Sequence, residues 1–261
     1  MCKITVIGAG HMGGAFAKGL LKSGINAEIT VTVRHMERAN EIKSEMPAVT
    51  VDTDNRRASA GADIIVLAVK PWQVQEIISE IKSNFTKDTI LISFAAGVFM
   101  EEMHKMMNDC ITPAAFYAIP NIAAEYNKSM TFLSPAADCS QEAVSKAKAL
   151  LEKVGKVMVC KEELTHAGML MASCGLAYII RILRIQSEAG VEMGFRPEAA
   201  LEIAMQTMDG ATSLLSGTDE HPEAIIDRVT TPGGYTIKGL NEMNHSGVAS
   251  AIIKTFKTGY K

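Results

Sequence analysis

A glycine-rich loop between a predicted strand and a predicted helix, at the beginning of the chain, is the feature that most constrains its fold. Residues 3–7 are a short run rich in β-branched side chains. The sequence Gly8-Ala9-Gly10-His11-Met12-Gly13 follows at once, and apolar residues then recur at helical spacing over residues 14–21. This order of strand, glycine loop and helix is typical of the turn that holds the pyrophosphate of a bound dinucleotide.

Each glycine of this loop has a distinct physical role. Gly8 allows the tight turn out of the strand, Gly10 lets the backbone approach the pyrophosphate, and Gly13 lets the helix pack closely on the sheet. The backbone N–H groups at the start of the helix are then available to phosphate oxygens. The alternative is a glycine-rich turn in another kind of α/β protein.

The end of the predicted second strand, residues 28–34, bears on the choice of cofactor. A site for NAD usually has an Asp or Glu about 20 residues beyond the glycines, where it accepts hydrogen bonds from the ribose 2′-OH. The sequence here is Thr32-Val33-Arg34-His35, without an acidic residue. Arg34, assisted by Arg38 one helical turn later, could instead pair with a 2′-phosphate. We therefore expect NADP (as NADPH), with NAD as the alternative. Arg34 could also be only an exposed cation at the end of a strand.

Strands and helices alternate along the first 160 residues. Nearly continuous apolar runs at residues 63–69 and 89–94 are expected for parallel strands covered on both faces. Further strands are predicted at residues 49–52, 112–119, 130–133 and 156–159, and helices at residues 36–46, 56–60, 71–81 and 141–154. This alternation predicts a Rossmann-type, doubly wound, mostly parallel sheet over residues 1–160.

Strand patterns end near residue 161, and the rest of the chain has helical patterns only. Helices are predicted at residues 166–193, 197–216, 222–229, 237–246 and 248–260. The expected fold class is therefore α/β, with the Rossmann-type sheet followed by an all-α C-terminal domain over residues 161–261. The apolar faces of these helices either form a large core or are buried against a second copy of the chain, in a homodimer or a higher homo-oligomer.

Composition and charge exclude several classes of protein. The formal net charge is −3, with no long run of one sign, so no nucleic-acid partner is expected. No apolar stretch reaches the roughly 18 residues needed to cross a bilayer, and the chain enters a strand at once, so neither a membrane partner nor a targeting leader is expected. The five cysteines form no C-x-x-C pair, which favours reduced thiols and a cytoplasmic location, and no metal site is expected.

Residues 227–239 are the second stretch that points to chemistry. Thr230 and Thr231 precede Pro232-Gly233-Gly234, and Thr236 follows at the start of a predicted helix, where it could be the N-cap. Free backbone N–H groups beside clustered hydroxyls would form a cradle for a small carboxylate. The alternative is an ordinary turn between two helices, which needs Gly and Pro but not so many hydroxyls.

Together these motifs resemble the Δ1-pyrroline-5-carboxylate reductases, the enzymes of the last step of proline synthesis, and the resemblance covers nearly the whole chain. The glycine loop looks like the family's cofactor loop, and residues 229–239 match its C-terminal signature. The other similar segments are Ala68-Val69-Lys70-Pro71, Ser93-Phe94-Ala95-Ala96-Gly97, Pro120-Asn121 and Glu220-His221-Pro222. The resemblance implies reduction of 1-pyrroline-5-carboxylate to L-proline, with a hydride moved from NAD(P)H to the cyclic imine carbon.

The resemblance also implies a set of site residues. In the family, the hydroxyl that matches Thr236 hydrogen-bonds the imine nitrogen, and the residue that matches Thr231 holds the carboxylate together with nearby backbone N–H groups. Thr236 is therefore the expected catalytic residue, and the expected substrate-binding residues are Thr230, Thr231, Gly233, Gly234 and Thr236. The expected cofactor-binding residues are Gly8, Gly10, His11, Met12, Gly13, Arg34, Ala68, Val69, Lys70, Pro71, Ala95, Ala96, Gly97 and Asn121.

Two segments depart from the family's pattern. Residues 172–178 lack the family's proline and have displaced hydroxyls, and Tyr117 stands where the family has an arginine. The alternatives are therefore a reductase for a related imine or hydroxy acid, or a non-catalytic NADP-binding regulatory protein. A β-hydroxyacid dehydrogenase would need a catalytic lysine in the helical domain, and no lysine occurs between Lys161 and Lys238.

Overall fold

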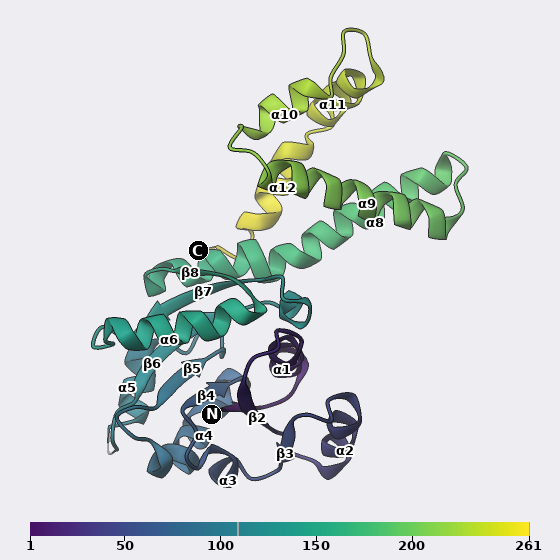
Figure 1. Ribbon diagram of the computed structural model, residues 1–261. Helices are drawn as coiled ribbons and strands as arrows, with labels where there is room; N and C mark the ends of the chain where they lie inside the picture. Colours follow the sequence, from purple (N-terminus) through teal and green to yellow (C-terminus); the bar gives the residue numbers. More distant parts are fainter. Residues whose placement is uncertain (109, 261) are drawn as a thin grey trace. The chain divides into compact units, whose positions relative to one another are not determined.

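The computed structural model describes residues 1–108 and 110–260 (Figure 1). The chain divides into two compact units, Met1–Ser173 and Cys174–Lys261. The first unit contains a β-sheet with helices on both faces, and the second contains helices only. This is the α/β arrangement that the sequence predicts, and the predicted fold class is confirmed.

One sheet forms the centre of the first unit. Its eight strands within residues 1–108 and 110–173 lie in the order β3-β2-β1-β4-β5-β6-β7-β8. Neighbouring strands are parallel except β6 and β7, which are antiparallel. The strands are β1 (Cys2–Ile7), β2 (Ala27–Thr32), β3 (Thr50–Asp52), β4 (Ile64–Leu67), β5 (Ile90–Ser93), β6 (Ala114–Ile119), β7 (Ser129–Pro135) and β8 (Gly155–Val159).

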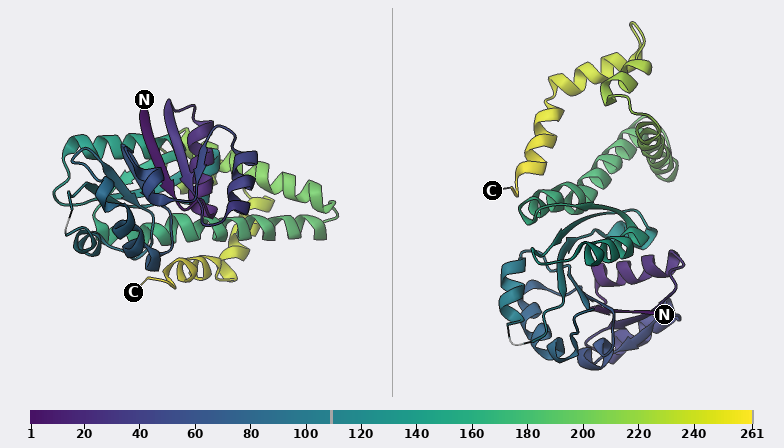
Figure 2. Two further views of the ribbon diagram at one scale, coloured as in Figure 1. Left: turned by 90° about the horizontal axis from the view of Figure 1, so that it is seen from below. Right: turned by 60° about the vertical axis from the view of Figure 1, so that its left-hand side comes forward.

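Helices cover both faces of this sheet (Figures 1 and 2). One core contains Ile64 and Val66 of β4, and the other contains Ile65 and Leu67, as expected for a strand buried on both sides. The first core includes side chains of α1 (His11–Lys22), α2 (Met36–Glu45) and α6 (Gln141–Leu151), and the second includes side chains of α4 (Val74–Ile81) and α5 (Met100–Met106). Shorter elements of this unit are α3 (Asn55–Ser59), α7 (Thr165–Gly168), the 3₁₀ turns η1 (Pro71–Gln73), η2 (Lys82–Asn84), η3 (Ile122–Tyr126), η4 (Glu152–Val154) and η5 (Glu162–Leu164), and a π-helical segment, Met169–Cys174.

The structure adds one helix to the first unit that was not predicted, and it shows which pair of strands in the mostly parallel sheet is antiparallel. Helix α5 was not predicted, because it buries only Met100 and Met103 and so repeats its apolar pattern over a single turn. Strands β6 and β7 are antiparallel because a short segment, residues 120–128, joins them. A parallel pair needs a crossover of about a dozen residues or more.

The first compact unit extends beyond residue 160 because the next segment packs on the sheet. A side chain at Gly168 would overlap the ring of Phe132 in β7. The Ser173 hydroxyl donates to the Pro120 carbonyl at 2.9 Å, and the Asn121 Nδ2 donates to the Ala172 carbonyl at 3.2 Å. The boundary between residues 160 and 161 therefore stays a prediction.

The second unit consists of helices with few buried side chains. They are α8 (Gly175–Glu192), α9 (Pro197–Ser216), α10 (Pro222–Arg228), α11 (Tyr235–His245) and α12 (Val248–Lys257). A Cβ at Gly190 of α8 would lie only 3.0 Å from the Cβ of Ala200 in α9. The glycine therefore lets these two helices pack closely. Many large apolar side chains of the unit are exposed, including Ile180 at 56% and Met205 at 50%.

No stretch long and apolar enough to cross a bilayer is expected from the sequence, but the helical run Glu162–Glu192 meets that criterion. Its most apolar part has a mean hydropathy of 1.5 and is 17% buried, so by length and composition alone it could cross a bilayer. A helix that buries an apolar face against another protein chain has the same composition.

Candidate functional site

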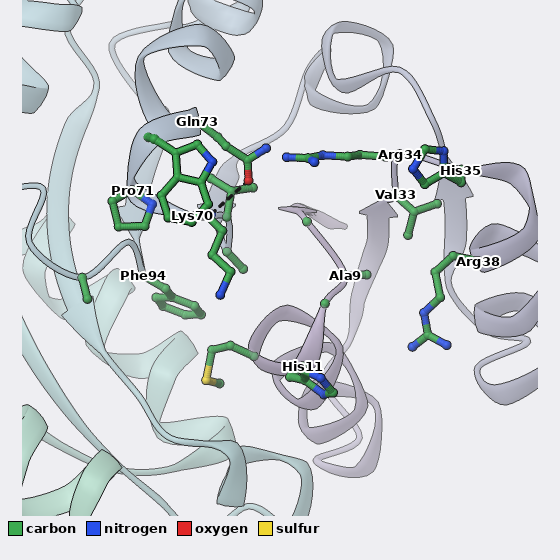
Figure 3. Close-up of a pocket in the computed structure, with 17 residues that line it drawn as sticks. Ala9, His11, Val33, Arg34, His35, Arg38, Lys70, Pro71, Gln73 and Phe94 are labelled. Carbon is green, nitrogen blue, oxygen red and sulfur yellow. Dashed lines mark hydrogen bonds between the residues drawn. The ribbon is translucent and has the colours of Figure 1, made fainter.

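A pocket of about 790 Å³ lies at the carboxyl ends of the central strands of the first unit (Figure 3). Strand β1 lies between β2 and β4, so the strand order reverses direction at the glycine loop. In doubly wound sheets, ligands bind at this position. The pocket is lined by Gly8, Ala9, Gly10, His11, Met12, Val33, Arg34, His35, Arg38, Ala68, Val69, Lys70, Pro71, Trp72, Gln73, Phe94 and Ala96.

The three glycines of the loop differ in what surrounds them. Gly8 has a φ of 94°, and a Cβ there would lie 2.8 Å from the Ala68 carbonyl oxygen. A Cβ at Gly13 would overlap the Gly8 carbonyl and lie 2.9 Å from the Ala68 Cβ, which keeps α1 close to the sheet. At Gly10, by contrast, no heavy atom of the described residues outside its immediate neighbours lies within 4 Å of the Cβ position. Gly10 therefore borders open space that a ligand can enter.

The start of α1 can hold an anion. Gly10 is the N-cap of this helix, and among the described residues no side chain caps it. The first backbone N–H groups of a helix have no partner within the helix and attract negative charge. With Gly10 open beside them, these groups fit the pyrophosphate of a dinucleotide.

Hydrogen bonds join the glycine loop to the end of β2. The Ala9 N–H donates to the Thr32 carbonyl at 2.8 Å, and the Gly8 N–H donates to Thr32 Oγ1 at 3.2 Å. The Thr32 hydroxyl in turn donates to Asn55 Oδ1 at 2.7 Å, and Asn55 Nδ2 donates to Glu80 Oε2 at 2.9 Å. These contacts fix the direction in which the chain leaves β2, and so bring Arg34 to the rim of the pocket.

Arg34 and Arg38 both line the pocket, but their surroundings differ. Arg38 Nη1 lies 2.6 Å from Glu41 Oε2 and 3.5 Å from Glu45 Oε1, and the hydrogen bond to Glu41 raises the pKa of the Arg38 guanidinium. Within the described part of the chain, Arg34 forms no ion pair, and its side chain extends toward Gln73 (Figure 3). Arg34 is therefore the cation of this pair that is available to a phosphate group.

Four of the predicted cofactor-binding residues lie outside the pocket lining: Gly13, Ala95, Gly97 and Asn121. Gly13 is covered by the contacts of α1, as described above. The Gly97 N–H donates to the Tyr117 hydroxyl at 3.0 Å, and Ala95 is buried. Asn121 Oδ1 accepts from the Ala123 N–H at 3.0 Å, so this side chain caps η3. The other predicted cofactor-binding residues are brought together around the pocket.

Tyr117 occupies the position of the arginine that the family pattern contains. Its side chain is buried, and its ring packs edge-on against Phe99, with 5.8 Å between the ring centroids. Burial raises the pKa of the Tyr117 phenol. Because its hydroxyl accepts the Gly97 N–H, Tyr117 holds the loop that follows β5.

Several lining residues were not predicted from the sequence. Val33 and His35 flank Arg34, and Trp72 and Gln73 directly follow Pro71. Phe94 is held in place by an edge-on contact with Phe16 of α1, with 5.2 Å between the ring centroids. Only the neighbourhood of the predicted motifs could have indicated these residues.

The predicted substrate-binding residues lie together in the turn between α10 and α11 of the second unit. Gly233 has a φ of 72°, and the Gly234 N–H donates to the Thr231 carbonyl at 3.0 Å. The Thr230 hydroxyl donates to the Ile226 carbonyl at 2.7 Å, which leaves the exposed hydroxyls of Thr231 and Thr236 for a ligand.

One detail of this turn corrects the sequence prediction. Gly234, not Thr236, is the N-cap of α11, and Thr236 is the second residue within the helix. Glycine at position 234 leaves room for the Thr231 hydroxyl, which a Cβ there would overlap in its present position. The first N–H groups of α11 thus lie beside Thr231 and can bind a carboxylate.

Comparisons with known proteins point to the same family as the sequence motifs. Residues 162–261 match the family described as pyrroline-5-carboxylate reductase dimerisation, and residues 3–97 match the family described as NADP oxidoreductase coenzyme F420-dependent. Pyrroline-5-carboxylate reductase 2 of Dictyostelium discoideum is 34% identical over 96% of this chain and 88% of its own length. Pyrroline-5-carboxylate reductase 2 of Bacillus subtilis is 34% identical over 97% of this chain and 91% of its own length.

Solved structures agree with these sequence relatives. The structure of a pyrroline-5-carboxylate reductase from Coxiella burnetii has a TM-score of 0.87 and 27% identity, and covers 98% of this chain and 95% of that chain. A crystal structure of Plasmodium falciparum pyrroline carboxylate reductase with NADP bound has a TM-score of 0.86 and 19% identity, covers 99% of this chain and 95% of that chain, and shares the fold. The family resemblance of the sequence is thereby confirmed. The chain belongs to the pyrroline-5-carboxylate reductase family, whose members are NAD(P)H-dependent oxidoreductases that act on a C=N bond.

Proposed function

We propose that this chain reduces 1-pyrroline-5-carboxylate to L-proline and uses NADPH as the hydride donor. The observation that carries the proposal is the pocket at the glycine loop, where an open Gly10 and the start of α1 lie on the same rim as Arg34. The presence of Arg34 supports NADPH rather than NADH as the cofactor. A guanidinium forms strong charge-assisted hydrogen bonds with a phosphate, and only NADPH has a 2′-phosphate.

The turn between α10 and α11 supplies groups suited to a cyclic imino acid. The exposed Thr231 hydroxyl and the first N–H groups of α11 would hold the substrate carboxylate, and the Thr236 hydroxyl would hydrogen-bond the imine nitrogen. When bound, NADPH supplies a hydride to the imine carbon. A protonated imine is already electrophilic, so the protein has only to orient it and exclude water.

The exposed apolar faces of α8 and α9 support a homodimer formed through the helical unit. Exposed large apolar side chains on paired helices mark an interaction surface. The segment that contains them, residues 162–261, matches the dimerisation family. We infer that a second copy of the chain, rather than a bilayer, covers the apolar face of Glu162–Glu192. A cytoplasmic location belongs to the same proposal, since no disulfide joins the five cysteines within the described residues.

The purified protein tests this proposal in a spectrophotometric assay of NADPH oxidation. The assay offers 1-pyrroline-5-carboxylate, a six-membered cyclic imino acid and a hydroxy or keto acid in parallel. We expect turnover with 1-pyrroline-5-carboxylate and the highest kcat/KM for it. A preference for another substrate would make the chain a related reductase. NADPH binding without turnover on any of them would make it a non-catalytic regulator.

A further inference from the structure

Trp72 is the feature of the pocket that the reaction chemistry does not require. It is the only tryptophan of the chain, and 78% of its surface is exposed. It lies in η1, which the Gln73 N–H closes by donating to the Lys70 carbonyl at 2.9 Å. The Lys70 N–H also donates to Gln73 Oε1 at 3.2 Å, so η1 has a defined conformation. A large indole ring held in solvent at a pocket rim is suited to contact a ligand.

The position of η1 indicates which part of a dinucleotide it would meet. The residue at the end of β2 in a Rossmann site contacts the 2′ position of the adenosine ribose. The adenosine half of a bound dinucleotide would therefore lie on the Arg34 side of the glycine loop. Arg34 extends from the end of β2 toward Gln73 of η1 (Figure 3). The base attached to that ribose would then lie between Arg34 and η1, where Trp72 also lines the pocket.

We propose that the Trp72 indole stacks on the adenine ring of NADPH, while Arg34 binds the 2′-phosphate of the same adenosine. The inference rests on the proposed function and adds to it a residue that sets cofactor affinity. Bases stack on aromatic side chains whatever their hydrogen-bonding pattern, so the indole needs no partner atoms on the adenine. Because adenine is remote from the reacting carbon, this contact strengthens cofactor binding without accelerating hydride transfer.

Tryptophan fluorescence tests the contact directly, since Trp72 is the only source of tryptophan emission. The wild-type protein is titrated with NADP⁺, with 2′,5′-ADP, which lacks nicotinamide, and with nicotinamide mononucleotide, which lacks adenine. We expect saturable quenching or a spectral shift with the first two ligands and none with the third. Calorimetry measures binding of each ligand independently. Binding of NADP⁺ and 2′,5′-ADP with unchanged Trp72 emission would overturn the inference and leave the proposed cofactor site intact. Absence of NADP⁺ binding would overturn both.

Two variants separate stacking from a structural role. Trp72→Ala should weaken NADP⁺ and 2′,5′-ADP binding roughly 5- to 100-fold, as expected for loss of one stacked base. In turnover it should raise the KM for NADPH and leave kcat nearly unchanged. Trp72→Phe retains an aromatic face and should restore most of the affinity.

Tyr126 offers a matched control. It is also an exposed aromatic residue of the first unit, at 68% exposure, and it is not among the residues that line the pocket. Tyr126→Ala should leave NADP⁺ affinity unchanged. Equal weakening by Trp72→Ala and Tyr126→Ala, or failure of Trp72→Phe to restore binding, would contradict the stacking contact.

Discussion

At the scale of single residues, we expect Arg34 to determine how strongly this chain distinguishes NADPH from NADH. Its guanidinium has no carboxylate partner within the described residues, whereas Arg38 is held by Glu41 and Glu45. Arg34→Ala should raise the KM for NADPH roughly 10- to 100-fold, since a hydrogen bond to a charged group contributes about 1.5–3 kcal/mol. The KM for NADH should change little, because NADH has no 2′-phosphate. Steady-state kinetics with both cofactors measures the effect.

Arg38 provides the internal comparison for this prediction. Its charge is already balanced by two glutamates, so Arg38→Ala should have a clearly smaller effect on the KM for NADPH than Arg34→Ala. An equal loss for both cofactors in Arg34→Ala would show that Arg34 does not recognise the 2′-phosphate.

Thr236 carries the predicted role in orienting the imine. It is exposed and lies within α11 near its start, so replacing it should not unfold the protein. Thr236→Ala should lower kcat/KM for 1-pyrroline-5-carboxylate roughly 10- to 100-fold, as expected for loss of one hydrogen bond made in the transition state. Thr236→Ser keeps a hydroxyl and should retain most of the activity. Wild-type kinetics in Thr236→Ala would exclude the assigned role.

At the scale of secondary-structure elements, Asp52 joins the end of β3 to α3. Its carboxylate accepts the backbone N–H groups of Thr53 and Asp54 at 2.7 and 3.0 Å, and Arg57 Nε donates to it at 2.8 Å. The hydrogen bond from Arg57 is the main cause that lowers the pKa of Asp52 to about 2. The pKa of an Asp side chain in the unfolded chain is about 3.9. Because the pKa of Asp52 is lower in the folded protein, its charge stabilises the fold fully at a pH above about 3.9. This stabilisation is lost as the pH falls toward the folded-state pKa.

Asp52→Asn should therefore lower the Tm at neutral pH, and its deficit relative to wild type should shrink as the pH falls from about 4 to about 2. The amide oxygen still accepts the two backbone N–H groups, but the amide nitrogen cannot accept from Arg57 Nε, so the variant removes the charge together with the Arg57 hydrogen bond. Thermal unfolding across this pH range measures it. Glu163→Gln, at an exposed carboxylate for which no ion pair occurs among the described residues, should show no such pattern. A deficit that stays constant with pH would contradict the role of the Asp52 charge.

The elements that could be predicted from the sequence are those whose pattern is local. The glycine loop lies within one strand–turn–helix unit, so residues 3–21 were enough to predict it. Trp72 reaches the same pocket from the loop after β4, directly after the predicted Lys70 and Pro71, but no local pattern marks Trp72 itself as a lining residue. The N-cap of α11 was misplaced because Thr236 has a capping side chain, whereas the close approach of Gly234 to Thr231 appears only once the turn is formed.

At the scale of the whole molecule, the proposed dimer explains why the helical unit exposes so many apolar side chains. Ile180 of α8 is 56% exposed, so a charge there should not disturb the packing within the unit. Ile180→Glu should shift the protein from dimer toward monomer, because it places a charge in an interface that excludes water. Sedimentation velocity or light scattering measures the change in mass.

Lys87→Glu serves as the control for this prediction. Lys87 is exposed in the first unit, and a charge reversal there should leave the mass unchanged. A monomeric wild-type protein, or an Ile180→Glu variant that remains as fully dimeric as wild type, would contradict an interface at this face of α8.

The proposed reaction forms L-proline from 1-pyrroline-5-carboxylate and oxidises NADPH to NADP⁺. The most direct test follows both products in one reaction, NADP⁺ by the loss of reduced-nicotinamide absorbance and L-proline by chromatography. We expect that one L-proline is formed for each NADPH consumed, and that both rates fall together in Thr236→Ala. NADP⁺ binding by calorimetry without any formation of L-proline would contradict it.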